Sequence, residues 1–98
     1  MTFEEASIVA IEARAELSEI LSDWIAVGDV LYVLPMATLG DDDVDHFPLV
    51  EVHILPQLPT ESKFSILHAA QPLVDSGVLV TMIWSEAPFP SNFTRTLH

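Results

Sequence analysis

An uninterrupted helical pattern runs from Thr2 to about Val27. No glycine or proline occurs before Gly28, and alanine, leucine, glutamate and isoleucine dominate the segment, which together predict a helix of about 25 residues. Thr2 and Glu5 have the spacing of a capping box, in which each side chain satisfies the other residue's backbone N–H. A helix this long must bury one face, so the rest of the chain has to supply a surface for it.

The predicted helix has an apolar face and an acidic stripe on the opposite side. At about 100° per residue, the apolar face comprises Phe3, Ala6, Ala10, Ala13, Leu17, Leu21 and Trp24. The stripe comprises Glu5, Glu12, Glu16, Glu19 and Asp23. Like charges three or four positions apart repel, so helix stability does not explain the stripe. It is either a solvated outer face or a contact surface for a basic partner, acting through charge complementarity.

The overall charge limits the classes of partner. Fifteen acidic and three basic residues give a formal net charge of −12, which argues against direct binding to nucleic acid or to an anionic membrane. Half of the 98 residues are hydrophobic, so the chain can form a core and is not a disordered acidic tail. The absence of cysteine excludes disulfides and thiolate chemistry.

The N-terminal residues and the hydropathy pattern predict a location. Glu4 and Glu5 stand where a secretory signal would carry positive charge. No apolar run reaches the roughly 18 residues of a membrane span. We therefore expect a cytoplasmic protein, in the host cytoplasm if a phage encodes it.

Three apolar segments predict strands. Val30–Leu34 is apolar on both faces, which is typical of a central strand, and Pro35 should end it. Leu49–Leu55 alternates between apolar and mixed positions, and 78–84 is again mostly apolar. Between the last two, Thr60 is expected to cap a helix that Pro72 kinks or restarts before Gly77.

The predicted fold is an α+β two-layer sandwich with the order α-β-β-α-β. We expect a three-stranded, mainly antiparallel sheet in the order 2-1-3, with the doubly apolar first strand in the centre and both helices on one face. Residues 1–87 form the single domain in this prediction, and 88–98 form an irregular C-terminal tail.

The sheet face without helices should be partly apolar. Leu49, Leu55 and one side of the third strand would supply it, and such patches mark interaction surfaces. A homodimer or a stable complex through this face or through an edge strand is therefore expected.

An acidic loop between the first two strands contains Asp41, Asp42, Asp43 and Asp45. It fails as a calcium loop because His46 stands where glycine is required and Val52 where the last carboxylate is required. A magnesium site of Asp43, Asp45 and Glu51 lacks an accompanying phosphate-binding segment. The loop is otherwise a solvated turn or an extension of the acidic stripe. Glu51 and His53 are expected to pair on the sheet, or to form a weak metal site with His46.

The functional prediction is a non-enzymatic, acidic protein-binding module that needs no cofactor or metal. Its composition is that of small inhibitors, such as phage counter-defence (anti-CRISPR) and bacterial immunity proteins, which occupy a basic, often nucleic-acid-binding, surface of a target as a nucleic-acid mimic. The predicted partner-binding residues are Glu5, Glu12, Glu16, Glu19, Asp23, Asp41, Asp42, Asp43 and Asp45. A homo-oligomeric assembly subunit and a magnesium-dependent enzyme built on the aspartate-rich loop are the alternatives.

Overall fold

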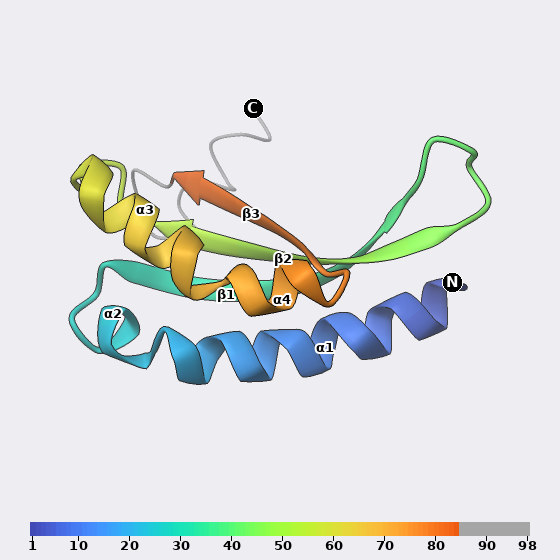
Figure 1. Ribbon diagram of the computed structural model, residues 1–98, viewed down its shortest axis with the longest axis horizontal. Coiled ribbons are helices and arrows are strands. Elements are labelled where there is room, and N and C mark those ends of the chain that lie inside the picture. The colour runs from blue at the N-terminus through green and yellow to red at the C-terminus, as the bar shows by residue number, and fades with distance from the viewer. Residues whose placement is uncertain (85–98) are drawn as a thin grey trace, which may run out of the picture.

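A computed structural model describes residues 1–84 of the chain as four helices and three strands in two layers (Figure 1). The elements are α1 (Phe3–Ile20), α2 (Ser22–Ala26), β1 (Val30–Leu39), β2 (His46–Ile54), α3 (Thr60–Ala69), α4 (Gln71–Asp75) and β3 (Leu79–Trp84). The α+β class is confirmed. The predicted tail, 88–98, and the predicted domain boundary at residue 87 lie outside the described residues.

The predicted first helix is confirmed in position but is divided in two. Thr2 caps α1, and the reciprocal bonds between Thr2 and Glu5 are both present. At Leu21 the backbone leaves helical geometry, with φ −95° and ψ 14°. The N–H of Leu21 still donates to Leu17 and the N–H of Ile25 to Leu21, so α2 continues from α1 after a bend.

Two glycines end helices as predicted. Gly28 and Gly77 have φ values of 86° and 102°, a left-handed conformation that is costly for other residues. After α2, the N–H of Gly28 donates to Ile25 and that of Asp29 to Trp24, which is the Schellman pattern. The same pair of bonds closes α4 at Gly77.

The second helical segment is also divided. As expected, a new helix begins around Pro72, which lies in the first turn of α4. The missing N–H of proline costs no helical hydrogen bond at this position. Thr60 does not cap α3. It is the first helical residue, and Pro59 holds the cap position without a side-chain hydrogen bond.

The predicted strand order 2-1-3 is wrong, and so is the prediction of a mainly antiparallel sheet, because the sheet is mixed. The sheet has the order β1-β2-β3, with β1 and β2 antiparallel and β2 and β3 parallel. The crossover through α3 and α4 therefore returns β3 directly beside β2. Strand β2 is central because it pairs with both neighbours, and its residues Val50, Val52 and Ile54 are fully buried. The apolar outer positions of β1 do not indicate double burial: Leu34 and Met36 are 36% and 43% exposed.

Pro35 does not end the first strand, which continues to Leu39. The side chain of Arg14 donates an Nε–H bond to the carbonyl of Val33 (3.4 Å), so Val33 presents its backbone groups to the free edge of the sheet. Backbone direction alternates along a strand, and Pro35 therefore faces the same edge, where the sheet needs no N–H donor.

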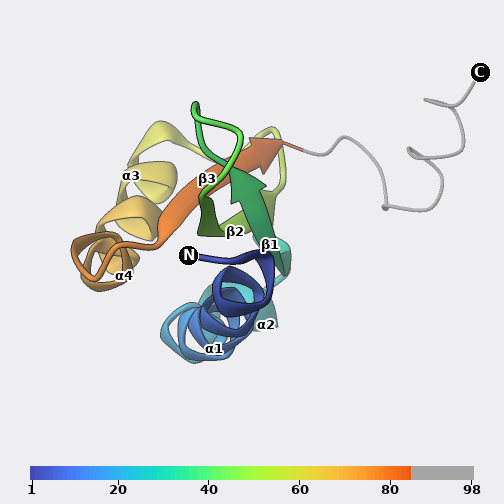
Figure 2. The ribbon, with the colours of Figure 1, turned by 90° about the vertical axis from the view of Figure 1, so that its right-hand side faces the viewer.

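The helices cover one face of the sheet (Figures 1 and 2). Helix α1 packs on β1 and β2, and α4 packs beside β3. The core that they enclose includes Leu17, Leu21, Val30, Val50, Val52, Ile54, Ile66 and Leu73. In the described part of the chain, no helix combines the length and the hydropathy needed to cross a membrane.

Replacing Leu17 by alanine tests this packing. Leu17 is fully buried, so Leu17→Ala should lower the free energy of unfolding by about 3 kcal/mol, measured by urea denaturation. Ile8→Ala is the matched control because Ile8 is 58% exposed on the same helix, and its effect should stay within about 0.5 kcal/mol. Equal losses would contradict the packing of α1.

Candidate protein-binding surfaces

The acidic stripe lies on the solvent side of the helical layer. Its members are all exposed, namely Glu5, Glu12, Glu16 and Glu19 of α1 and Asp23 of α2. The opposite face is buried through Ala6, Ala10, Ala13 and Leu17, as predicted. Phe3 is an exception: it is 58% exposed and meets the His46 ring edge-on, with the ring centroids 5.6 Å apart.

The aspartate-rich loop is a tight turn organised by Asp42. The Asp42 carboxylate accepts the N–H groups of Val44 (3.0 Å) and Asp45 (3.1 Å). These two bonds hold the pKa of Asp42 below its ordinary value. Asp43 adopts a left-handed conformation with φ 57°, which aspartate tolerates better than most residues. Asp42 therefore has a structural task, while Asp41, Asp43 and Asp45 are exposed.

The N-terminus brings this loop next to the start of α1. The Met1 ammonium lies 3.7 Å from the Asp45 carboxylate, and the Met1 carbonyl accepts the N–H of His46 (2.8 Å). Glu5 lies in the first turn of α1, where the Thr2 backbone and side chain lower its pKa by hydrogen bonding. The loop and the beginning of the stripe thus share one end of the molecule (Figure 1).

The lysine and arginine within residues 1–84 lie away from the acidic residues. Arg14 bonds to the edge of β1, and the Lys63 ammonium sits over the Trp84 ring at 4.4 Å from its centroid. None of the predicted partner-binding carboxylates has a lysine or arginine partner within the described part of the chain. Within residues 1–84, the Met1 ammonium beside Asp45 is therefore the one cation paired with this acidic surface.

The predicted metal groupings do not assemble. Within residues 1–84, no group of three histidine, aspartate or glutamate side chains is placed to hold an ion. Glu51 is six positions beyond Asp45 along an extended strand, a separation of about 20 Å. His46 lies at the start of β2 and packs against Phe3. It is therefore also distant from Glu51 and His53, which lie further along the strand.

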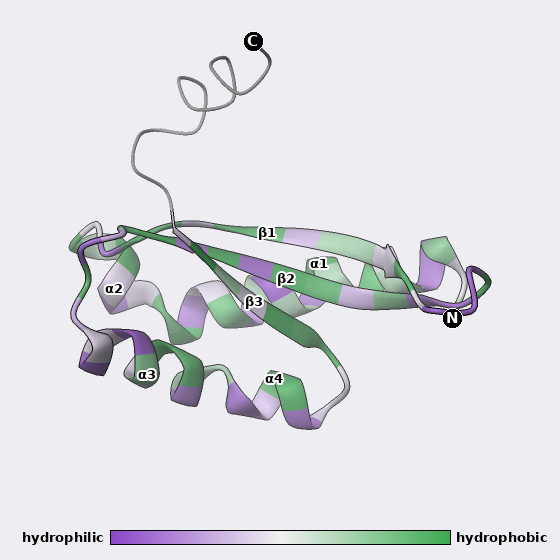
Figure 3. Cartoon of the chain, turned by 90° about the horizontal axis from the view of Figure 1, so that it is seen from above, coloured by the Kyte–Doolittle hydropathy of each residue, from purple (hydrophilic) through white to green (hydrophobic). Residues whose placement is uncertain are grey.

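The sheet face opposite the helices is apolar. Side chains alternate between the two faces of a strand. The residues of β2 that alternate with its buried positions therefore point to this open face. Figure 3 looks down on this side of the molecule and shows apolar segments along all three strands. The open face comprises Tyr32, Leu34, Met36 and Thr38 of β1, Phe47, Leu49, Glu51 and His53 of β2, and Leu79, Thr81 and Ile83 of β3.

Several large side chains on the open face are accessible. Leu34, Met36, Phe47 and Leu79 are 36%, 43%, 44% and 50% exposed. The predicted apolar face is thus present, with Leu49 on it as expected. Leu55 lies just beyond the end of β2, and the contribution of β1 was not foreseen. Val33 and Pro35 alternate with Leu34 and Met36, and this alternation indicates that Leu34 and Met36 share a face. The prediction that Pro35 ends the strand excludes Met36 from it.

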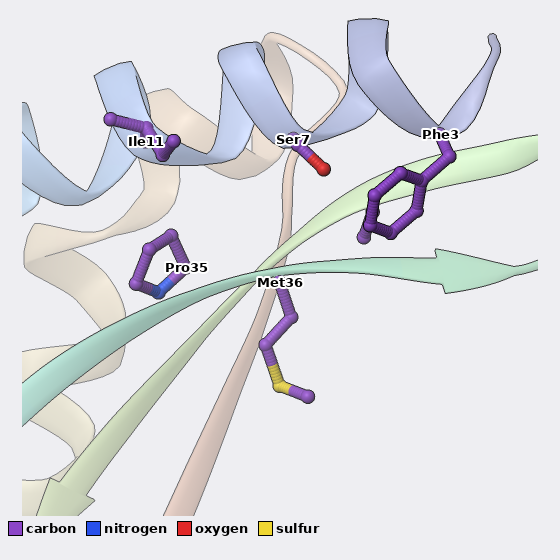
Figure 4. A pocket seen from close by; sticks show the side chains of 6 residues that line it. Phe3, Ser7, Ile11, Pro35 and Met36 are labelled. Carbon is purple, nitrogen blue, oxygen red and sulfur yellow. The ribbon is translucent and has the colours of Figure 1, made fainter.

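The apolar surface continues around the edge of β1 to α1. A cavity of about 370 Å³ there is lined by Phe3, Ser7, Ile11, Pro35, Met36 and Ala37. Figure 4 shows Pro35 on the helix side of the strand and Met36 on the other side. Among the described residues, its lining is apolar apart from the Ser7 hydroxyl, so the cavity offers a packing surface.

The centre of the open face is polar. The Nε2 atom of His53 lies 3.1 Å from Oε1 of Glu51, which confirms the predicted pair. The His53 ring stacks on Tyr32 of the neighbouring strand, with centroids 4.2 Å apart and an interplanar angle of 21°. His53 is only 8% exposed, so the pair is fixed in the sheet.

Comparison with known proteins gives no relative. The sequence matches no protein-family model, and neither a curated protein nor a solved structure matches the chain.

The pH dependence of stability tests the role of Asp42. Its pKa is lower in the folded state, so ionised Asp42 stabilises the fold above about pH 4, the ordinary carboxyl range. That contribution disappears as the pH falls through the lowered pKa. Asp42→Asn should therefore make the unfolding free energy fall less steeply on acidification than in the unsubstituted protein, measured by urea denaturation from pH 7 to pH 2.5.

Asp41→Asn is the control for this experiment. The Asp41 carboxylate makes no hydrogen bond within the described residues, so this variant should keep the original slope. An equal slope for Asp42→Asn would show that Asp42 does not organise the turn.

Proposed function

We propose that this chain is a non-enzymatic protein-binding module whose open sheet face docks on a protein partner. The observation that supports the proposal is an apolar face spanning three strands, with four large side chains at least 36% exposed. Large exposed apolar patches on proteins are commonly interaction sites. Burying these side chains in an interface removes them from water, which is the main favourable contribution to protein association.

The distribution of charge agrees with this use. Within residues 1–84, the helical layer and the hairpin loop hold the exposed carboxylates, whereas the open face holds one carboxylate, that of Glu51. Interface centres are depleted of charged residues, and their rims are polar. The separation of an acidic layer from an apolar face supports binding through the sheet, with the acidic layer left in solvent.

The acidic surface supports a second candidate, inhibition of a basic protein. The nine predicted partner-binding carboxylates are exposed and unpaired with lysine or arginine within residues 1–84. They could occupy a surface that otherwise binds phosphates, in the manner of a nucleic-acid mimic, and the resulting affinity would fall steeply with salt.

Affinity capture from cells of the source organism distinguishes the candidates. The sheet variant Leu34→Glu/Leu79→Glu should lose the partner, because each substitution places a carboxylate inside the apolar contact. The stripe variant Glu12→Lys/Glu16→Lys/Glu19→Lys should retain the partner. Both variants need confirmation of folding by circular dichroism, and the captured proteins are compared quantitatively at about 50 mM and about 500 mM salt.

Each other outcome has a defined meaning. Loss in the stripe variant together with retention in the sheet variant would contradict docking through the sheet and support the inhibitor. Recovery of only this chain, as a salt-insensitive oligomer that the sheet variant abolishes, would identify the partner as a second copy and the protein as an assembly subunit.

A further inference from the structure

The polar centre of the open face is surrounded by apolar side chains. Glu51 lies on the middle strand, directly opposite Leu34 on β1 and Thr81 on β3. Among the residues of this face it is the one acidic side chain within the described part of the chain. Anything that covers the face must therefore also cover a carboxylate.

The Glu51 carboxylate is held in place. His53 Nε2 lies 3.1 Å from Oε1, and the side chains are 21% exposed for Glu51 and 10% for His53. Since a carboxylate only accepts hydrogen bonds, Nε2 carries the proton. Stacking on Tyr32 fixes the ring. Glu51 is thus a positioned anionic acceptor with limited access to water.

The second ring nitrogen of His53 is buried. In the neutral ring, a protonated Nε2 leaves Nδ1 with a lone pair. This Nδ1 atom is buried and has no hydrogen-bond partner within residues 1–84, although buried polar atoms are normally paired. Because Nδ1 is enclosed and the Glu51 side chain is 21% exposed, Glu51 is the acceptor that the pair presents to a partner.

We infer that the partner covers this centre with an arginine side chain set in an apolar surface. The inference rests on the proposed docking through the sheet. Covering the face removes water from the Glu51 carboxylate, whose partner within residues 1–84 is His53, and a cation beside the carboxylate compensates for this loss of hydration. A guanidinium supplies several donors in one plane, stacks on aromatic rings such as Tyr32, and is enriched at interface centres.

Within residues 1–84, a second copy of this chain has no lysine or arginine on its own open face. Face-to-face pairing would bring two Glu51 carboxylates together, and like charges at an interface oppose association. Arg14 of each copy lies at the β1 edge on α1, and Lys63 lies on α3 over the Trp84 ring. The charge pattern of residues 1–84 therefore favours a different, basic protein as the occupant.

A pair of peptides tests the inference on the full chain. The probes are acetyl-Leu-Val-Arg-Val-Leu-amide and the same peptide with citrulline, the uncharged analogue of arginine. In ¹⁵N-labelled protein, the arginine peptide should shift the amide signals of Leu34, Glu51 and Thr81. Its affinity should exceed that of the citrulline peptide about tenfold, the effect expected for one charge-assisted hydrogen-bonded pair.

Two variants locate the effect. Glu51→Gln keeps the size of the side chain and should abolish the preference for arginine. Glu16→Gln removes one charge from the acidic stripe, changes the net charge equally, and should leave the preference intact. Loss of the preference in both variants would show a general charge effect and would overturn the inference.

The outcomes separate this inference from the proposed function. Equal binding of both peptides to the open face, or an arginine preference that survives Glu51→Gln, would overturn the inference while docking through the sheet still stood. Shifts confined to the acidic residues of α1, or no shifts with either peptide, would contradict both. Shifts of the open face that depend on protein concentration without peptide would indicate self-association and overturn the choice of partner.

Discussion

The sheet has two faces, and the helices of residues 1–84 cover one of them. Helix α1 covers β1 and β2 through small residues and Leu17, and α3 and α4 add Ile66 and Leu73. This packing buries Val50, Val52 and Ile54 completely, so the alternate positions on β2 must point away from the core. The open face is a direct geometric consequence of that burial.

The same packing determines where charge can lie. Residues on the outer side of α1 face solvent. The hairpin loop lies next to the start of α1, where Met1 contacts Asp45 and His46. Carboxylates at these positions lose little hydration, whereas carboxylates on the open face would oppose any apolar contact. Glu51 is an exception to this pattern. The His53 ring lies within hydrogen-bond distance of its carboxylate and is itself stacked on Tyr32. A carboxylate that is held in place within an apolar surface is typical of a recognition site rather than of a solvated face.

The sequence was informative where local chemistry determines structure. The capping box at Thr2, the helix ends at Gly28 and Gly77, the restart at Pro72 and the Glu51–His53 pair all follow from interactions between near neighbours. The two Schellman motifs need a left-handed residue, and glycine provides it without a steric penalty.

Strand order could not be obtained in this way. The apolar character of β1 predicts central burial, but one of its faces contributes to the exposed surface instead. Proline is tolerated within a strand where its nitrogen faces a free edge of the sheet. Whether β1 has a free edge follows only from the strand order, so the sequence predicts that Pro35 ends the strand. The sequence therefore predicts an apolar open face, but it does not identify the members of that face on β1.

Photo-cross-linking in living cells tests most directly whether the open face is the contact surface. The photoreactive residue benzoylphenylalanine replaces Leu34 on the open face in one variant and Ile8 on the outer side of α1 in the other; both residues are exposed. Irradiation should link the Leu34 variant to one defined protein through a segment containing arginine, identified by mass spectrometry, and should give no such product from the Ile8 variant. Products from the Ile8 position alone would contradict docking through the sheet and would identify the helical layer as the binding surface.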